Sequence, residues 1–336
     1  MRTSRLRTAL CAVAATAMLA GCGEFHNTIT PQPGTTTHIE LLLSGQPNGM
    51  MAGVYEAIAL GYYHQSDMHV YISQPQRGEQ PLMMLHNYRT EIAVSSEPNL
   101  LLERDQNIPV VAVAAIVQSP LSAVEVKLPA PPARSKSCGA KQKHLHCTDK
   151  DGSKGSKNTK QAAGKRSGTA PATLPSLGTV GTSGPEPNSE LTLPARATAA
   201  LAGPNTPNYD GLIFAVRPAS IVNAAPDIRR FLQTTARGYE AARSDPEQAI
   251  DNMIAQVPAL APRRALLLAQ LKAYLPHMFP APTTGPKGEL HPQPWGYLSP
   301  GAWSQFGNWL HLRGLIEDPN AVTDSNTNEL LAGKGV

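Results

Sequence analysis

The sequence lacks several features that would assign it to a common functional class. After residue 20 it has no run of about eighteen consecutive apolar residues, so no later membrane-spanning helix is expected. Its four cysteines form no cysteine-rich run, and it has no nucleophile elbow, phosphate-binding loop or zinc motif. We therefore predict that the protein is not an enzyme and has no cofactor and no bound metal.

Basic residues are also scarce outside one segment. Between Ala133 and Arg166 there are ten Lys or Arg and two Asp, whereas the whole chain has a net charge of only +4. Without this segment and the three N-terminal arginines, the remaining chain carries a net charge of −7. It has no basic globular surface of the kind that binds nucleic acid, so we predict no nucleic-acid partner.

The N-terminus has the pattern of a secretion signal. Arg2, Arg5 and Arg7 precede an apolar span from Thr8 to Ala20, and the small-residue tetrad Leu19-Ala20-Gly21-Cys22 closes it. The tetrad resembles the bacterial lipobox, in which the cysteine becomes the acylated first residue. An ordinary signal peptide cut elsewhere and a short membrane anchor are the alternatives. We predict a signal peptide over 1–21, lipidation of Cys22, a tether over 22–37 and a lipid anchor on the extracytoplasmic face of the cell membrane.

Two cysteines then remain in an oxidising compartment. Cys138 and Cys147 are predicted to form a disulfide. His144 and His146 leave a metal site open as the alternative, but adjacent ligands at 146 and 147 are poor zinc spacing.

The first third of the chain alternates between strand-like and helical patterns. Its strands read as nearly continuous apolar runs, which is typical of a parallel sheet covered on both faces. Strands are expected at 39–43, 68–72, 91–95 and 109–117. Helices are expected around Val54–Ala59, at 81–87 and at 98–106.

The composition changes abruptly after this region. Residues 129–176 are dominated by Lys, Ser, Gly, Ala, Pro and Thr, which predicts a basic, low-complexity, disordered insert. Residues 191–208 are predicted to be little more than a loop, and a strand follows at 211–216. The rest is predicted to be helical, at 226–240, after the N-cap Asp245, at 263–274, and from a cap at Ser299-Pro300 to Gly314. Trp303, Phe306 and Leu310 in the last helix are assigned to the core.

Short motifs in the two ordered regions resemble one family. Pro47-Asn48, Gly53-Val54-Tyr55 and Gly61-Tyr62-Tyr63 resemble the opening of the solute-binding proteins that capture the pyrimidine precursor of thiamine. The wider group also binds nitrate, taurine and alkanesulfonates. Further similar segments are 69–72, 92–98, 104–106, 117–121, 179–184, 295–297 and 327–330.

The resemblance implies a function and a fold. It implies a solute-binding component of an ABC importer, with a small-molecule solute and an ABC permease subunit as partners. The implied fold is α/β, of the periplasmic-binding-protein type (type II), with a parallel-sheet lobe over 38–122 and 209–331. Fungal pyrimidine synthases share this fold but carry a cysteine cluster that is absent here.

The predicted ligand-binding residues follow the ends of the strands or lie on the first helix. In an open parallel sheet, solutes bind beyond the carboxyl ends of the strands. The predicted residues are Asn48, Tyr55, Ser95, Ser96, Glu97 and Gln118. Several have a structural alternative: Asn48 as a turn residue, Ser95 and Glu97 as helix caps, and Gln118 as an exposed hinge.

Two departures from the family pattern affect the expected binding mode. The family usually has an aromatic residue and a histidine where this chain has Gly45 and Met51, so an aromatic wall is missing. The second lobe is expected to be largely missing, reduced to a remnant over 177–208. The sequence therefore leaves a second hypothesis open, a degenerate relative that binds a partner without transporting a solute.

Overall fold

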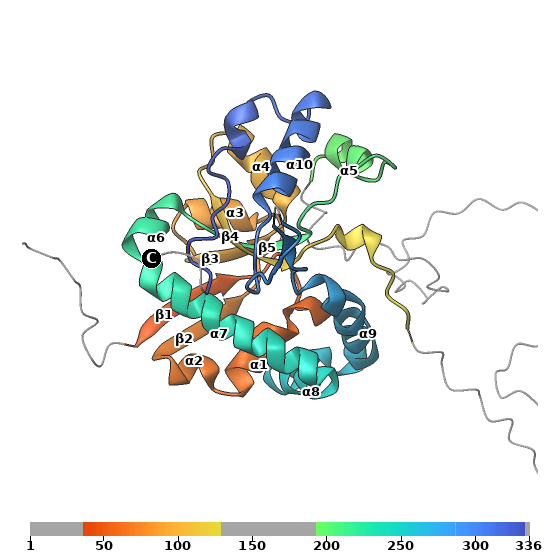
Figure 1. Cartoon of the computed structure of the whole chain (residues 1–336). Helices are drawn as coiled ribbons and strands as arrows, with labels where there is room; N and C mark the ends of the chain where they lie inside the picture. The colour runs from red at the N-terminus through yellow and green to blue at the C-terminus, as the bar shows by residue number, and fades with distance from the viewer. Residues whose placement is uncertain (1–35, 129–192, 286, 333–336) are drawn as a thin grey trace, which may run out of the picture. The chain divides into compact units, whose positions relative to one another are not determined.

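The structure is a computed structural model that describes residues 36–128, 193–285 and 287–332 (Figure 1). The predicted lipidation site Cys22, the predicted disulfide Cys138–Cys147 and the predicted insert at 129–176 lie outside these residues. In the described part of the chain, no helix combines the length and apolarity needed to cross a bilayer.

The first described segment alternates strands and helices, as predicted. Its strands are β1 (Thr37–Leu42), β2 (Met68–Ser73), β3 (Ile92–Ser95) and β4 (Val111–Val117). Its α-helices are α1 (Ala52–Ala59), α2 (Tyr62–Gln65), α3 (Pro81–His86) and α4 (Glu97–Asp105), and its 3-10 helices are η1 (Gly49–Met51) and η2 (Leu121–Ala123).

The second half supplies one strand of the main sheet and most of the helices. Its helices are α5 (Ala195–Leu201), α6 (Pro218–Asn223), α7 (Ala225–Ser244), α8 (Pro246–Gln256), η3 (Pro258–Arg263), α9 (Arg264–Tyr274), η4 (Leu275–His277), α10 (Pro300–Leu312) and η5 (Pro319–Val322). Its strands are β5 (Leu212–Val216) and the short pair β6 (Thr283–Thr284) and β7 (Leu290–His291).

The main sheet has the strand order β2-β1-β3-β5-β4. β1 pairs in parallel with β2 and β3, whereas β5 runs antiparallel to both β3 and β4. The prediction of a parallel sheet is therefore wrong at β5, and the sheet is mixed. An apolar run such as 212–216 contains no information about strand direction, because a strand buried on both faces has the same composition in either orientation.

Helices cover both faces of the sheet and bury two apolar cores (Figure 1). One core packs α1, α7, α8 and α9 against the sheet, with Phe231 and Tyr239 among its largest buried residues. The other packs α3, α4, α5 and α10, and it contains Trp303, Phe306 and Leu310, as predicted. The apolar cores lie on the two faces of the sheet, and the polar residues considered below lie at the ends of its strands.

Two predictions about the second half need correction. The stretch 191–208 is more than a loop, because α5 forms over Ala195–Leu201 and buries Ala197 and Leu201. Ser299 precedes α10, but its side chain makes no capping hydrogen bond. The predicted cap at Asp245 is confirmed, since its carboxylate accepts a hydrogen bond from the Gln248 backbone N–H at 3.0 Å.

Between β4 and β5 the described residues form only η2 and α5. Most of the predicted lobe remnant, 177–208, lies outside the described residues, including 179–184. The expectation of a reduced second lobe therefore stays a prediction.

Candidate functional site

Three strand ends meet at one edge of the sheet around the start of β5. The register pairs Ser95 with Ile213 and Val117 with Leu212, so the carboxyl ends of β3 and β4 flank the amino end of β5. The carboxyl end of β1 lies next to β3, through the pair Leu42 and Ala93. This edge brings together most of the predicted ligand-binding residues.

Glu97 is the most buried polar residue of this edge. Its side chain is 1% exposed, and its Oε2 accepts a hydrogen bond from the Asp210 backbone N–H at 2.7 Å. The Glu97 backbone N–H donates to the Asp210 carbonyl at 3.0 Å, which completes a two-bond link between α4 and the start of β5. Oε1 of Glu97 is buried and has no hydrogen-bond partner among the described residues.

Asp210 is the partner that sequence reasoning missed. Its Oδ2 accepts a hydrogen bond from the Trp303 indole N–H at 2.7 Å, so α10 fixes the carboxyl group from the other side. Its proximity to Glu97 depends on β5 running antiparallel, which reverses the end of that strand that reaches the edge. The only signal in the sequence was a carboxylate directly before a buried apolar strand.

Burial changes the protonation of both carboxyl groups. Desolvation raises the pKa of Asp210 to about 7, although the hydrogen bond from Trp303 opposes the shift. Desolvation, with the nearby Asp210 as a smaller cause, raises the pKa of Glu97 well above its ordinary value. A protonated Glu97 has an O–H group, so the edge offers both a donor and acceptors to a polar heterocycle.

Asn48 and Ser96 have structural roles as caps. The Asn48 Oδ1 accepts a hydrogen bond from the Met50 backbone N–H at 3.0 Å and caps η1. The Ser96 hydroxyl oxygen accepts a hydrogen bond from the Asn99 backbone N–H at 3.4 Å and caps α4. The helix cap is therefore Ser96, and the alternative role of Ser95 as the cap is wrong. Both residues are buried, at 5% and 2% exposure.

A glycine lets the loop after β1 approach α9. A Cβ on Gly49 would lie 2.2 Å from the Leu267 carbonyl oxygen, a distance that backbone atoms cannot accommodate. The Gly49 N–H instead donates to the Gln270 side chain at 3.1 Å. Asn48 is therefore held in position by η1 and by α9.

Gln118 and Tyr55 occupy different surroundings. The Gln118 amide donates to the Tyr297 carbonyl at 2.8 Å, so its side chain bridges two chain segments. Next to it, Ser119 has a buried hydroxyl without a hydrogen-bond partner in the described part of the chain. Tyr55 lies within α1 and is 4% exposed, and desolvation raises its pKa to about 12. The phenol therefore stays protonated at neutral pH.

The positions that depart from the family pattern also lie beside this edge. Gly45 follows β1 and is half-buried, whereas the Met51 side chain is 2% exposed and belongs to the core. Neither residue supplies a flat ring to a ligand. Within the described residues, no group of three or more His, Cys, Asp or Glu has the placement to hold a metal ion.

A family model described as NMT1/THI5 like matches residues 48–130, which include this edge up to β4 and the segment after it. Over these residues the chain is similar to the NMT1/THI5-like family. One curated relative of the NMT1/THI5-like segment is the formylaminopyrimidine-binding protein of Halalkalibacterium halodurans, 33% identical over 86 residues. The match spans 26% of this chain and 26% of that protein.

Two solved structures resemble the chain more broadly. The alkanesulfonate-binding protein of Xanthomonas axonopodis pv. citri, bound to MOPS, is 13% identical with a TM-score of 0.45. The match covers 87% of this chain and 98% of the alkanesulfonate-binding protein. The ligand-binding component of an ABC-type import system from Staphylococcus aureus, with zinc bound, is 11% identical with a TM-score of 0.46. The match covers 88% of this chain and 97% of that component. The curated relative and these two structures are all described as binding proteins or binding components.

Proposed function

We propose that this protein is the lipid-anchored, extracytoplasmic solute-binding component of an ABC importer. The observation that carries the proposal is the NMT1/THI5-like match of residues 48–130, which spans the loop after β1, β3 and β4. Asn48, Ser95 and Glu97 of this segment lie at one edge of the sheet. The lipid is proposed to be on Cys22, and the partner to be an ABC permease subunit.

The proposed solute is a small pyrimidine related to thiamine precursors, or a related nitrogen or sulfonate compound. The relative from Halalkalibacterium halodurans is named for binding a formylaminopyrimidine. Such a ring carries hydrogen-bond donors and acceptors, which the buried Glu97 carboxyl and the Ser95 hydroxyl complement. Asn48, Tyr55, Ser96 and Gln118 complete the proposed binding set.

The proposed domain organisation has one complete lobe. It consists of 38–122 and 209–331, with the reduced second lobe over 177–208 and the basic insert over 129–176. The composition of residues 129–176, dominated by Lys, Ser, Gly, Ala, Pro and Thr, supports the assignment of the insert.

A second candidate is a solute-binding relative that has become an interaction module without transport. Asn48, Ser96 and Gln118 already use their side chains within the lobe, at 3.0, 3.4 and 2.8 Å from their partners. Gly45 and Met51 also offer no aromatic wall. These observations favour weak solute binding or none.

A thermal-shift and calorimetry screen of the mature protein separates the two candidates. Formylaminopyrimidine, other pyrimidines, polyamines, taurine and nitrate are the probes. A saturating rise in melting temperature with one solute supports import, because a ligand that binds only the native state stabilises it. If no solute raises the melting temperature while the relative from Halalkalibacterium halodurans responds in the same assay, import is excluded.

A substitution at the sheet edge then tests the site. Ser95→Ala removes a buried hydroxyl and should weaken solute binding by about tenfold, the effect of one lost hydrogen bond in a buried site. Ser304→Ala, on the exposed face of α10, is the matched control and should leave the affinity unchanged. Equal affinities of the two variants would remove Ser95 from the binding set.

A further inference from the structure

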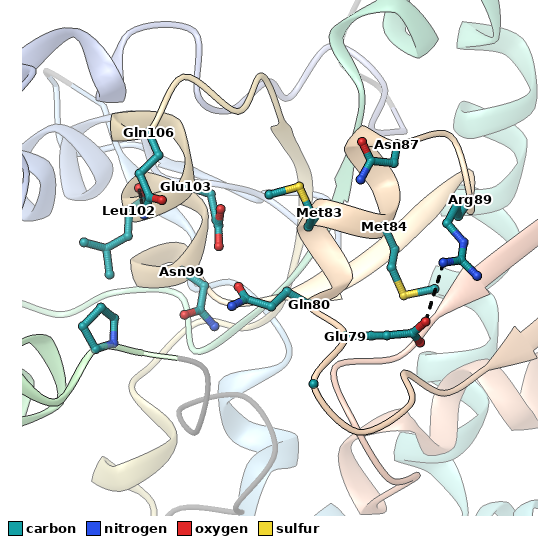
Figure 2. Close-up of a pocket in the computed structure, with 12 residues that line it drawn as sticks. Glu79, Gln80, Met83, Met84, Asn87, Arg89, Asn99, Leu102, Glu103 and Gln106 are labelled. Atoms are coloured by element: carbon teal, nitrogen blue, oxygen red, sulfur yellow. Dashed lines mark hydrogen bonds and ion pairs between the residues drawn. The ribbon is translucent and has the colours of Figure 1, made fainter.

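A cavity lies between α3 and α4, and none of the residues predicted for the sheet edge lines it. It has a volume of about 480 Å³, within the usual range for small-molecule sites. Its walls come from the loop before α3, from α3 and α4, and from Pro194 just before α5 (Figure 2). The cavity is therefore separate from the strand ends at which the solute is proposed to bind.

Glu103 is the charged group that gives this cavity its chemistry. Its carboxylate is partly buried on α4, and desolvation by burial is the cause that raises its pKa. No described residue forms a hydrogen bond or ion pair with this carboxylate. A positive group in the cavity would supply the missing counter-charge.

The other charged residues of the cavity are already paired. The Glu79 carboxylate accepts a hydrogen bond from the Gln76 backbone N–H at 2.8 Å and lies 3.7 Å from the Arg89 guanidinium. Arg89 is 62% exposed and faces Glu79, away from Glu103 (Figure 2). The lining residues Glu79, Arg89 and Glu103 together carry a net charge of −1.

Neutral side chains around Glu103 add acceptors and apolar contacts. Figure 2 shows the Gln80 side chain extending from the start of α3 toward Asn99 on α4, beside the Glu103 carboxylate. Met83 on α3 and Leu102 on α4 also line the cavity. Carboxamide oxygens accept hydrogen bonds from N–H donors, and thioether and aliphatic groups pack against methylene chains.

We propose that this cavity binds a small organic cation, one with a primary amine or guanidinium group on a short aliphatic chain. The cationic head donates to the Glu103 carboxylate and to the Gln80 carboxamide oxygen. The aliphatic chain lies against Met83 and Leu102. The site is independent of the solute proposed for the sheet edge.

Calorimetry with agmatine on the full mature protein tests the proposal. Agmatine carries a guanidinium and an amine on a short chain, and N-butylurea is its neutral counterpart. We expect saturable binding of agmatine and an affinity for N-butylurea at least about tenfold lower, because a charge-assisted hydrogen bond is about twice as strong as a neutral one. No saturable binding of agmatine below about 10 mM, or equal affinities for the two compounds, overturns the proposal.

Two Glu→Gln variants, each of which removes one negative charge, locate the binding site. Glu103→Gln keeps the shape of the side chain and should weaken agmatine binding by about tenfold or more. Glu125→Gln, at a side chain that is 67% exposed and outside this cavity, should leave the affinity unchanged. The same affinity in both variants overturns the proposal.

An NMR titration of the unmodified protein gives a result even if Glu103→Gln does not fold. Backbone amides of Gln80, Met83 and Glu103 should shift on addition of agmatine. Shifts confined instead to the strand ends around Ser95 and Gln118 would assign the cation to the sheet edge and overturn the proposal.

Discussion

At the scale of the residue, Asp210 is the side chain whose chemistry depends most on its surroundings. Its carboxyl group is held between the Trp303 indole and the α4 terminus, and burial raises its pKa to about 7. Between its ordinary pKa of 3.8 and about 7, the native state binds more protons than the unfolded chain. The contribution of Asp210 to stability should therefore fall as the pH rises through this window and level off above it.

The Asp210→Asn variant should reduce this pH dependence. Its amide oxygen still accepts the hydrogen bond from Trp303, but it has no charge to lose or gain. Urea unfolding between pH 5 and 8 should show a slope shallower than that of the unmodified protein by up to about 1.4 kcal/mol per pH unit. Asp251→Asn is the control, because the hydrogen bond from Arg264 lowers the pKa of Asp251 and keeps it ionised over this range. Equal slopes for all three proteins would contradict the expectation.

At the scale of the element, the packing of α1 on α7 depends on two glycines. A Cβ on Gly238 would lie 2.1 Å from the Gly53 carbonyl oxygen and 2.7 Å from the Ala57 Cβ. Gly238→Ala would push the two helices apart, and we expect a loss of about 1–3 kcal/mol of unfolding free energy. Chemical denaturation measures the change.

The control for this substitution is on another helix. Gly301 lies in α10, and a Cβ there would meet nothing within 4 Å. Gly301→Ala should be neutral or stabilising by up to about 1 kcal/mol, because alanine loses less backbone entropy in a helix. A Gly238→Ala variant as stable as Gly301→Ala would show that α1 and α7 do not need this close approach.

Arg104 holds the C-terminal segment on α4 and β4. Its guanidinium donates to the carbonyls of Val110, Ala321 and Thr323 at 2.9, 2.6 and 2.5 Å. The same segment pairs with the outer edge of β4, where Thr327 N–H donates to the Ala112 carbonyl at 2.9 Å. It therefore covers a sheet edge that would otherwise have unpaired backbone groups.

Arg104→Met should loosen this segment while α1, α7 and α8 stay protected. Amide hydrogen exchange should accelerate at Ala321 to Thr327, since the hydrogen bonds from Arg104 to the Ala321 and Thr323 carbonyls are lost. Arg243→Met is the control, because that arginine is exposed and pairs with Glu240 on its own helix. Unchanged exchange at 321–327 in Arg104→Met would assign the anchoring to the pairing with β4 alone.

At the scale of the whole molecule, the predicted anchor determines where the protein works. Lipidation of Cys22 is expected from the sequence pattern alone. In cells given an alkyne-labelled fatty acid, the unmodified protein should be labelled and Cys22→Ser should not. Cys138→Ser, which leaves the tetrad intact, should keep the label. Equal labelling of Cys22→Ser would contradict the lipobox assignment.

Much of the fold was predictable because its signals are local. The strands from β1 to β5 are short apolar runs, and caps such as Asp245 precede helices at fixed spacing. The helix α5 was missed because the prolines around it, Pro194 and Pro204, outweighed its alanine-rich pattern. Ser96 caps α4 where Ser95 was considered, because adjacent serines give the same local signal and only the backbone geometry selects one.

The candidate site was predictable only in part. The position of Ser95, Ser96, Glu97 and Gln118 at the sheet edge was predictable because polar residues that follow a buried strand lie there. Asp210 and the α3–α4 cavity were not found. Both depend on residues far apart in the chain, and the spacing of residues in sequence does not indicate such contacts.

The sequence by itself determined the expected extracytoplasmic location, the succession of strands and helices and the likeness to solute-binding proteins. It did so because charge order, periodicity and short motifs are properties of neighbouring residues. The tertiary structure decided the direction of β5, and with it the hydrogen bonds that join Asp210 to Glu97 and to Trp303. The physical reason is that burial and strand pairing arise only when distant segments meet. Those contacts set the protonation of the two carboxyl groups and join Gln118 to the Tyr297 carbonyl.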